Sequence, residues 1–98
     1  DETELERVAS DLRIRNDAEV SVRRFDALDP ESGKLFLAST LDPSNPPAGI
    51  LVASGYLGDA ERARTDNTEA DRILRINFSG LVPIVSAVAQ RLEEAGRG

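Results

Sequence analysis

The apolar run ILVA at residues 50–53 constrains the fold of this chain more than any other feature of its sequence. Successive side chains of an extended strand point to opposite faces, so a strand of this composition must be covered on both sides. The run therefore predicts a strand over residues 49–54 in a parallel sheet with helices on its faces. The strand ends at Gly55 and Gly58, which allow another group to approach the main chain closely, although an ordinary turn would also explain them.

The segments around this run supply the other elements of an α/β fold. Val20 and Val22 alternate with polar residues and are followed by Phe25, which predicts a second strand over residues 19–26. Apolar residues at helical spacing predict helices over residues 2–13, 30–41 and 68–95, with a helical turn at 60–64. A helical crossover between two strands makes them parallel. Because two strands form a poor core, we expect them to be the middle of a larger sheet.

The long helix predicted over residues 68–95 carries an apolar stripe that we expect to pack on the sheet. Its members are Leu74, Phe78, Leu81, Val85, Val88 and Leu92. Beside the stripe, Asn77 lies in a row of otherwise small or apolar residues. An unpaired buried amide costs about 1–3 kcal/mol, so we expect Asn77 to bond either to a specific site or to neighbouring backbone. Gly80 predicts a close backbone approach, and Pro83 predicts a kink.

Composition excludes several classes of function. The chain contains no cysteine or histidine, which removes disulfides, thiol nucleophiles, imidazole bases and nearly every zinc site, and we expect no bound metal. A net charge of −6 argues against nucleic acid as a partner. No run of about 18 apolar residues and no signal peptide is visible, so we expect a cytoplasmic protein without a membrane span.

Three stretches in this order resemble the middle of a short-chain dehydrogenase/reductase. They are RRFDALD at residues 23–29, AGILVASGYLGD at 48–59 and DRILRINFSG at 71–80. The resemblance implies an α/β fold that is part of a doubly wound, Rossmann-like parallel sheet, with two parallel strands and flanking helices. Residues 1–98 would be an internal fragment of a single NAD(P)-binding domain, without its first strand and Gly-rich loop and without its C-terminal catalytic part.

The resemblance also implies roles for particular residues. Asp26 matches the acid that contacts the adenine ring, and Gly55 matches the glycine at the end of the strand, beneath the ribose of the cofactor. Ala53 and Ser54 would adjoin the cofactor as well, although this sequence departs here from the commoner Asn-Asn-Ala. Asn77 matches the active-site Asn, whose main-chain carbonyl holds a water linked to the catalytic Lys.

The function implied is hydride transfer between NAD or NADP and a small carbonyl or alcohol substrate, by an enzyme that we expect to be a homo-oligomer. The family's Tyr-x-x-x-Lys pair is absent, because the only tyrosine is Tyr56 and the only lysine is Lys34, so we expect this chain alone to be inactive. The alternative is a non-enzymatic α/β nucleotide-binding or interaction module in which Asp26 and Asn77 serve packing. A flavodoxin-like or receiver domain fits less well, since Lys34 is not placed at a strand end.

Overall fold

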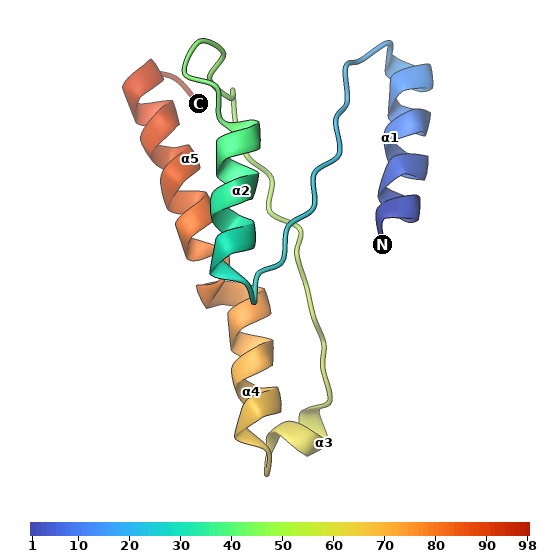
Figure 1. The fold of residues 1–98 in the computed structure, drawn as a ribbon, viewed down its shortest axis with the longest axis vertical. Helices are drawn as coiled ribbons and strands as arrows, with labels where there is room; N and C mark the ends of the chain where they lie inside the picture. Colours follow the sequence, from blue (N-terminus) through green and yellow to red (C-terminus); the bar gives the residue numbers. More distant parts are fainter.

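The chain folds into helices joined by two long extended segments (Figure 1), as a computed structural model of residues 1–98 shows. The helical elements are α1 (Glu2–Asn16), α2 (Pro30–Thr40), α3 (Ala60–Ala63), α4 (Asn67–Leu74), the π-helical turn η1 (Arg75–Ser79) and α5 (Val82–Ala95). Every predicted helix is therefore present, with ends within a few residues of those expected from the sequence.

Side chains at the helix ends explain where the helices begin. Asp1 accepts a hydrogen bond from the amide of Thr3 at 2.9 Å, and Asp29 accepts one from Glu31 at 3.0 Å before Pro30 opens α2. These carboxylates satisfy amides that have no partner within the helix and carry a charge that suits its N-terminal dipole. Gly96, with φ of 67°, ends α5 as its sequence position predicts.

The predicted strands at residues 19–26 and 49–54 are wrong, and so is the Rossmann-like parallel sheet inferred from them. Both segments are extended but form no ladder, and the single β-bridge of the chain joins Asp42 to Asn45 across a turn. A strand is stable only when its backbone N–H and C=O groups pair with adjacent strands and its apolar side chains pack against other elements. Two strands alone provide little of either. Leu51, in the apolar run, is 92% exposed, so no element of this chain covers that face.

The predicted long helix is present but is interrupted by η1. The amide of Gly80 donates to the carbonyl of Arg75, five residues earlier, at 2.8 Å, which is the spacing of a π-helix. The amide of Leu81 then donates to Phe78 at 2.9 Å before α5 starts. Pro83 has no amide to continue the ladder, and the helix is interrupted just before it, near the point where the sequence predicts a kink.

The face of this helix that packs differs from the one predicted. Leu74, Phe78 and Val85 are exposed, at 65%, 70% and 41%, so the expectation that this stripe packs on a sheet is wrong. Val88, a member of the stripe, is buried together with Ile84 of the neighbouring row, where α5 lies beside α2 (Figure 1). The reason is that α2 is the only long element against this helix, and it covers only this part of it.

Helix α1 stands apart from the other helices (Figure 1). Its link to the extended segment that follows is Arg13, which donates two hydrogen bonds to the carbonyl of Val20, at 2.9 and 2.6 Å, and pairs with Glu6 at 2.6 Å. Asp17 makes the turn between them in the left-handed conformation, with φ of 49°. The candidate site described below is formed by residues within the rest of the chain, 25–98.

Candidate functional site around Asn77

Asn77 on η1 holds the extended segment at Tyr56 through both the oxygen and the nitrogen of its side-chain amide. Its Oδ1 accepts the backbone amide of Tyr56 at 2.9 Å, and its Nδ2 donates to the Tyr56 carbonyl at 2.7 Å. Nδ2 also donates to the carbonyl of Ile73, one turn earlier, at 2.8 Å. The side chain thus pairs with Tyr56 as a neighbouring strand would. All of these partners are backbone groups, which is the second of the two alternatives expected from the sequence, and Asn77 itself is exposed rather than buried.

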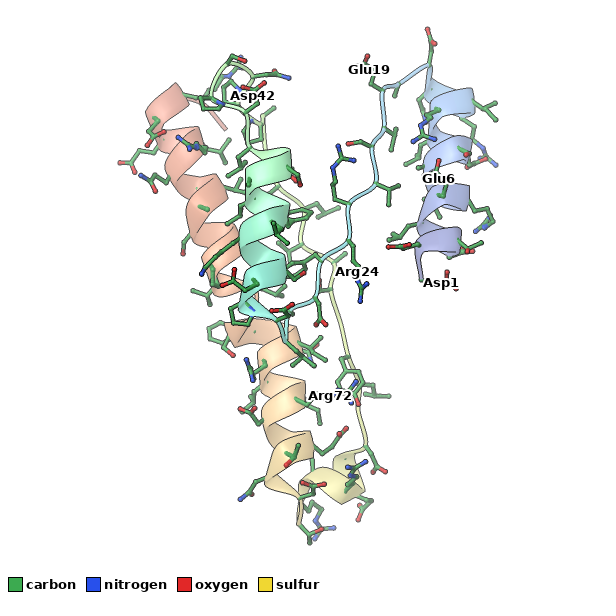
Figure 2. All side chains as sticks on the ribbon, viewed as in Figure 1. Asp1, Glu6, Glu19, Arg24, Asp42 and Arg72 are labelled. Carbon is green, nitrogen blue, oxygen red and sulfur yellow. The ribbon has the colours of Figure 1, made fainter.

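Glu69 on α4 binds the same segment a little further along. It is 4% exposed, and its Oε1 accepts the hydroxyl of Tyr56 and the backbone amide of Asp59, each at 3.0 Å. The guanidinium of Arg72, labelled in Figure 2, lies 5.1 Å from the centre of the Tyr56 ring. A cation over a tyrosine face is attracted by the ring quadrupole, so Arg72 adds to the attachment of Tyr56.

The two glycines of this segment have different surroundings. Gly58 has φ of +66°, and a side chain there would meet Ile73 Cγ1 at 2.6 Å and Glu69 Oε1 at 2.8 Å. Only glycine suits that position, because both the backbone conformation and the space exclude a Cβ. At Gly55 a Cβ would meet nothing closer than Asn77 Oδ1, at 4.0 Å. The main chain at Gly55 is therefore open on the side where a side chain would project.

Among the residues selected from the sequence, Gly55 and Asn77 lie together and Asp26 does not join them. Ala53, Ser54 and Gly55 are all exposed, and the segment reaches Asn77 at the next residue, Tyr56. The carboxylate of Asp26 accepts the amide of Leu28 at 2.9 Å and so closes the turn before α2. No hydrogen bond or ion pair connects Asp26 to residues 53–55 or to Asn77.

Glu69, Tyr56 and Arg72 were not selected as site residues from the sequence. Glu69 follows Asp66 by three residues, the spacing of a capping box, in which the acid would return to the start of its own helix. Here it reaches the amide of Asp59, at the start of α3, instead. The sequence spacing marks the helix start correctly, but the partner depends on how α3 lies against α4.

The charge pattern around α4 is set by an ion pair at its start. Arg62 lies 3.0 Å from Asp66 and, together with the backbone amide of Thr68, holds the pKa of this carboxyl below its usual value. The same carboxylate raises the pKa of Arg62. No group of three or more acidic side chains is placed to hold a metal ion. The arrangement is suited to fixing the segment 55–59 rather than to ligating an ion.

The helical run Asn67–Ala95 is long and apolar enough to cross a membrane, judged by length and composition alone. Core helices of soluble proteins can have the same length and composition. The run is also interrupted by η1, whose polar Asn77 is committed to Tyr56. These observations do not assign the helix to a membrane.

The chain is similar to several bacterial proteins named as uncharacterized oxidoreductases. It is 32% identical over 90 residues to one from Mycobacterium tuberculosis, in both strain H37Rv and strain CDC 1551, which covers 92% of this chain and 36% of each relative. It is 33% identical over 99 residues to another, from the region 5′ of mprA in Streptomyces coelicolor, which covers 96% of this chain and 37% of that protein.

No family model matches the chain, and no solved structure matches it. The chain spans little more than a third of the length of the curated relatives that it matches. Nearly all of its own residues, Asn77 and the segment before it included, fall within the similarity. The comparisons thus support a relationship to oxidoreductases, at the level that the names of these relatives express.

Proposed function

We propose that this chain is a segment of a short-chain oxidoreductase that transfers a hydride between NAD or NADP and the carbonyl or alcohol group of a small substrate. The observation that carries the proposal is the position of Asn77, which holds the main chain immediately after the open Gly55. The similarity to proteins named oxidoreductases extends over this region and supports it. The π-helical turn under Asn77 supports it too, because such turns occur frequently at functional sites.

The residues of the segment fit a cofactor that lies against the main chain. Ala53, Ser54 and Gly55 are small and exposed, and the space beside Gly55 is open to 4.0 Å from the position of a Cβ. Asp26 lies outside this segment and is exposed. One of its carboxylate oxygens accepts a hydrogen bond from the amide of Leu28, which leaves acceptor capacity for the adenine amino group of a cofactor. When bound, NAD(P) would supply the hydride chemistry.

In this proposal the chain itself orients the cofactor and takes part in a proton path. Asn77 fixes the main chain at Tyr56 through its side-chain amide, and its main-chain carbonyl would hold a water for proton transfer. Glu69 and Arg72 keep Tyr56 against α4, so the segment cannot move away from η1 without breaking a hydrogen bond to a buried carboxylate. Proton transfer through a positioned group contributes to the transition state rather than to binding.

Titration of the full protein with NADH and NADPH, followed by fluorescence or calorimetry, tests the cofactor. Gly55→Val should weaken binding by about tenfold or more, because its side chain enters the space a ligand needs while meeting no protein atom closer than 4.0 Å at Cβ. Gly49→Val is the matched control, since a Cβ at Gly49 has nothing within 4 Å. Equal losses for both variants would contradict the placement of the cofactor.

The role of Asn77 is tested separately by steady-state kinetics. We expect Asn77→Ala to lower kcat by at least about tenfold and to change cofactor affinity less, because the group acts in the transition state. Asn67→Ala, at the exposed start of α4, is the control and should leave both parameters unchanged. A loss of affinity without a loss of kcat would assign Asn77 to cofactor binding instead.

A non-enzymatic interaction module is the second candidate function. It is favoured by the hydrogen bonds of Asn77, whose side chain is satisfied by backbone groups of Tyr56 and Ile73. If the full protein binds neither NADH nor NADPH, this second function replaces the first.

A further inference from the structure

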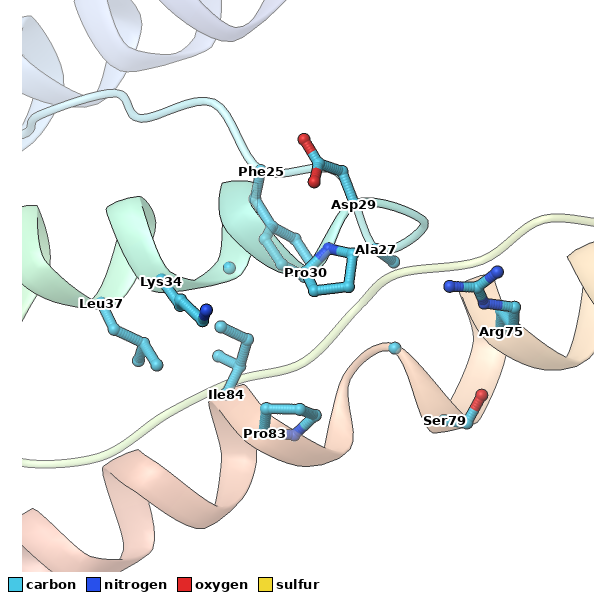
Figure 3. Close-up of a pocket in the computed structure, with 12 residues that line it drawn as sticks. Phe25, Ala27, Asp29, Pro30, Lys34, Leu37, Arg75, Ser79, Pro83 and Ile84 are labelled. Carbon is cyan, nitrogen blue, oxygen red and sulfur yellow. The ribbon is translucent and has the colours of Figure 1, made fainter.

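A cavity lies beside η1, between the start of α2 and the start of α5 (Figure 3). It is a cavity of about 340 Å³, which is within the range of about 300–1,000 Å³ typical of pockets for small molecules. Its apolar lining includes Phe25, Leu37, Pro83 and Ile84. Phe25 is held in place by Phe36, with ring centres 5.6 Å apart, so this wall is formed by packed side chains.

Two glycines make the cavity possible. Gly80 approaches the carbonyl oxygen of Ala27 so closely that no Cβ would fit, which brings η1 against the turn before α2. Gly33 faces the cavity from α2, and a Cβ there would lie 3.7 Å from Phe25 Cε2 and 3.8 Å from Ile84 Cδ1. The space beside Gly33 therefore belongs to the cavity, and a side chain at this position would begin to fill it.

Cationic groups stand at the edge of this apolar wall. Arg75 and Lys34 both line the cavity, and Figure 3 shows them on opposite sides of Pro30. Arg75 donates to the carbonyl of Leu28 at 3.3 Å, and its nearest carboxylate, on Asp71, is 3.8 Å away. The guanidinium has five N–H donors, so these long contacts leave several of them for a ligand.

Asp29, the acidic residue that lines the cavity, forms no ion pair with Arg75 or Lys34. The Oδ1 of Asp29 accepts the amide of Glu31 at 3.0 Å as the cap of α2, and Figure 3 shows this carboxylate directed away from Pro83 and Ile84. Lys34 is paired with Glu31 at 2.6 Å on the exposed surface, and that pairing raises its pKa, so it stays charged at neutral pH. The hydroxyl of Ser79 adds a neutral donor on the η1 side.

We propose that this cavity binds a small amphipathic anion, with an aromatic or similarly flat apolar body against Phe25 and Ile84 and a carboxylate at Arg75. Planar, bidentate recognition of a carboxylate is the geometry that a guanidinium provides best. Burial of the ring supplies the affinity, and the cation selects the charged end.

The site is independent of the proposed cofactor site. None of Ala53, Ser54, Gly55 and Asn77 lines the cavity. The turn η1 nevertheless contributes to both, since Asn77 binds Tyr56 while Arg75 and Ser79 line the cavity. Failure of nicotinamide binding and failure of anion binding are therefore separate results.

The test is calorimetric and ligand-observed NMR titration of the full protein, without nicotinamide cofactor, with three probes. Phenylacetate carries the ring and the charge, phenylacetamide carries the ring without the charge, and inorganic phosphate carries charge without a ring. We expect phenylacetate to bind at least about tenfold more tightly than either of the others, as the loss of one charge-assisted hydrogen bond or of the ring's burial predicts.

Variants at residues of the cavity test whether phenylacetate binds there. Gly33→Leu should abolish phenylacetate binding by filling the space, and Arg75→Gln should weaken it about tenfold, whereas Arg75→Lys should retain more of it than Arg75→Gln. Arg24→Gln, an exposed cation outside the cavity, is the control and should bind as the unchanged protein does. Backbone amide spectra of each variant report whether the fold persists.

Three results would overturn the proposal: no binding of phenylacetate, equal binding of phenylacetate and phenylacetamide, or undiminished binding to Gly33→Leu. Tight binding of phosphate alone, unaffected by Gly33→Leu, would show a surface anion contact and would overturn it as well. If Gly33→Leu fails to fold, the comparison of Arg75→Gln with Arg24→Gln decides, since equal affinities in that pair contradict the role of Arg75.

Discussion

At the scale of single residues, the two glycines near the contact between α2 and α5, Gly33 and Gly80, differ in whether a side chain would fit. Gly80 lies so close to the backbone oxygens of Ala27 and Arg75 that a Cβ would overlap them, the second at 2.6 Å. Gly33 faces two side-chain atoms at ordinary contact distances of 3.7 and 3.8 Å. Glycine is therefore required at position 80. At position 33 its missing side chain leaves space that forms part of the cavity beside α2.

We predict that Gly80→Ala destabilises the protein by about 1–3 kcal/mol, because overpacking against a rigid backbone outweighs the better helix propensity of alanine. Gly33→Ala, the matched change, should stabilise it by up to about 1 kcal/mol, through helix propensity and a less flexible unfolded chain. Urea unfolding followed by circular dichroism measures both. Equal effects of the two changes would show that the approach of Gly80 to Ala27 does not determine packing.

The candidate site was partly predictable from residues alone. The position of Asn77, in an otherwise apolar or small row, predicts that its side chain is hydrogen-bonded, and backbone groups of Tyr56 are its partners. The contribution of Glu69 could not be predicted, because its spacing from Asp66 describes a local cap. Its actual partner, the amide of Asp59, is set by the contact between α3 and α4.

At the scale of elements, the start of α4 combines a helix cap with an ion pair. Asp66 accepts the amide of Thr68 at 2.9 Å and the guanidinium Nε of Arg62 at 3.0 Å. Both bonds favour the ionised carboxylate, so the pKa of Asp66 is lowered in the folded chain, chiefly by Arg62 and then by Thr68. The end of α3 and the beginning of α4 are thereby joined through one side chain.

This linkage predicts a pH dependence of the α3–α4 corner. A carboxyl whose pKa falls on folding contributes stability that is complete above its unfolded pKa, near 3.9, and that is lost as the pH falls through the folded pKa. We expect the amide resonance of Thr68 to shift and its exchange protection to fall over that acidic range.

Asp66→Asn provides the control for that titration, since asparagine keeps the cap but not the charge. Its Thr68 resonance should not titrate through this group, and the corner should be slightly less stable at neutral pH. An unchanged acid titration of Thr68 in Asp66→Asn would assign the effect to another carboxylate.

At the scale of the whole molecule, the chain is extended for its length. Its radius of gyration is 15.9 Å, compared with about 13 Å for a compact domain of about 100 residues. Only Ala9, Glu69, Ile84 and Val88 are buried, and Leu51 and Leu57 are 92% and 93% exposed. Exposed apolar area on this scale is associated with self-association or with partners.

We therefore predict that the isolated chain self-associates and unfolds with low cooperativity. Replacing both Leu51 and Leu57 by Lys should reduce the associated fraction in sedimentation velocity experiments while leaving the helical circular dichroism signal unchanged, because fully exposed side chains contribute little to packing. Ile84→Lys, at a buried position, is the contrasting change and should unfold α2 from α5. A monomer with cooperative unfolding and the radius of a compact domain would contradict this prediction.

The sequence by itself determined the helices, because their signals are local. Caps such as Asp29 before Pro30, the left-handed Gly96 and the missing amide of Pro83 act within a turn of their own position, and each has its predicted effect. Tertiary structure alone decided which faces are covered. The apolar run at residues 50–53 stays exposed without a ladder, and α2 covers Ile84 and Val88 but leaves Phe78 exposed. Strand pairing and helix burial depend on partners that are distant in the chain. The hydrophobic pattern of the sequence therefore shows which residues would be stabilised by burial, but it does not show which element buries them.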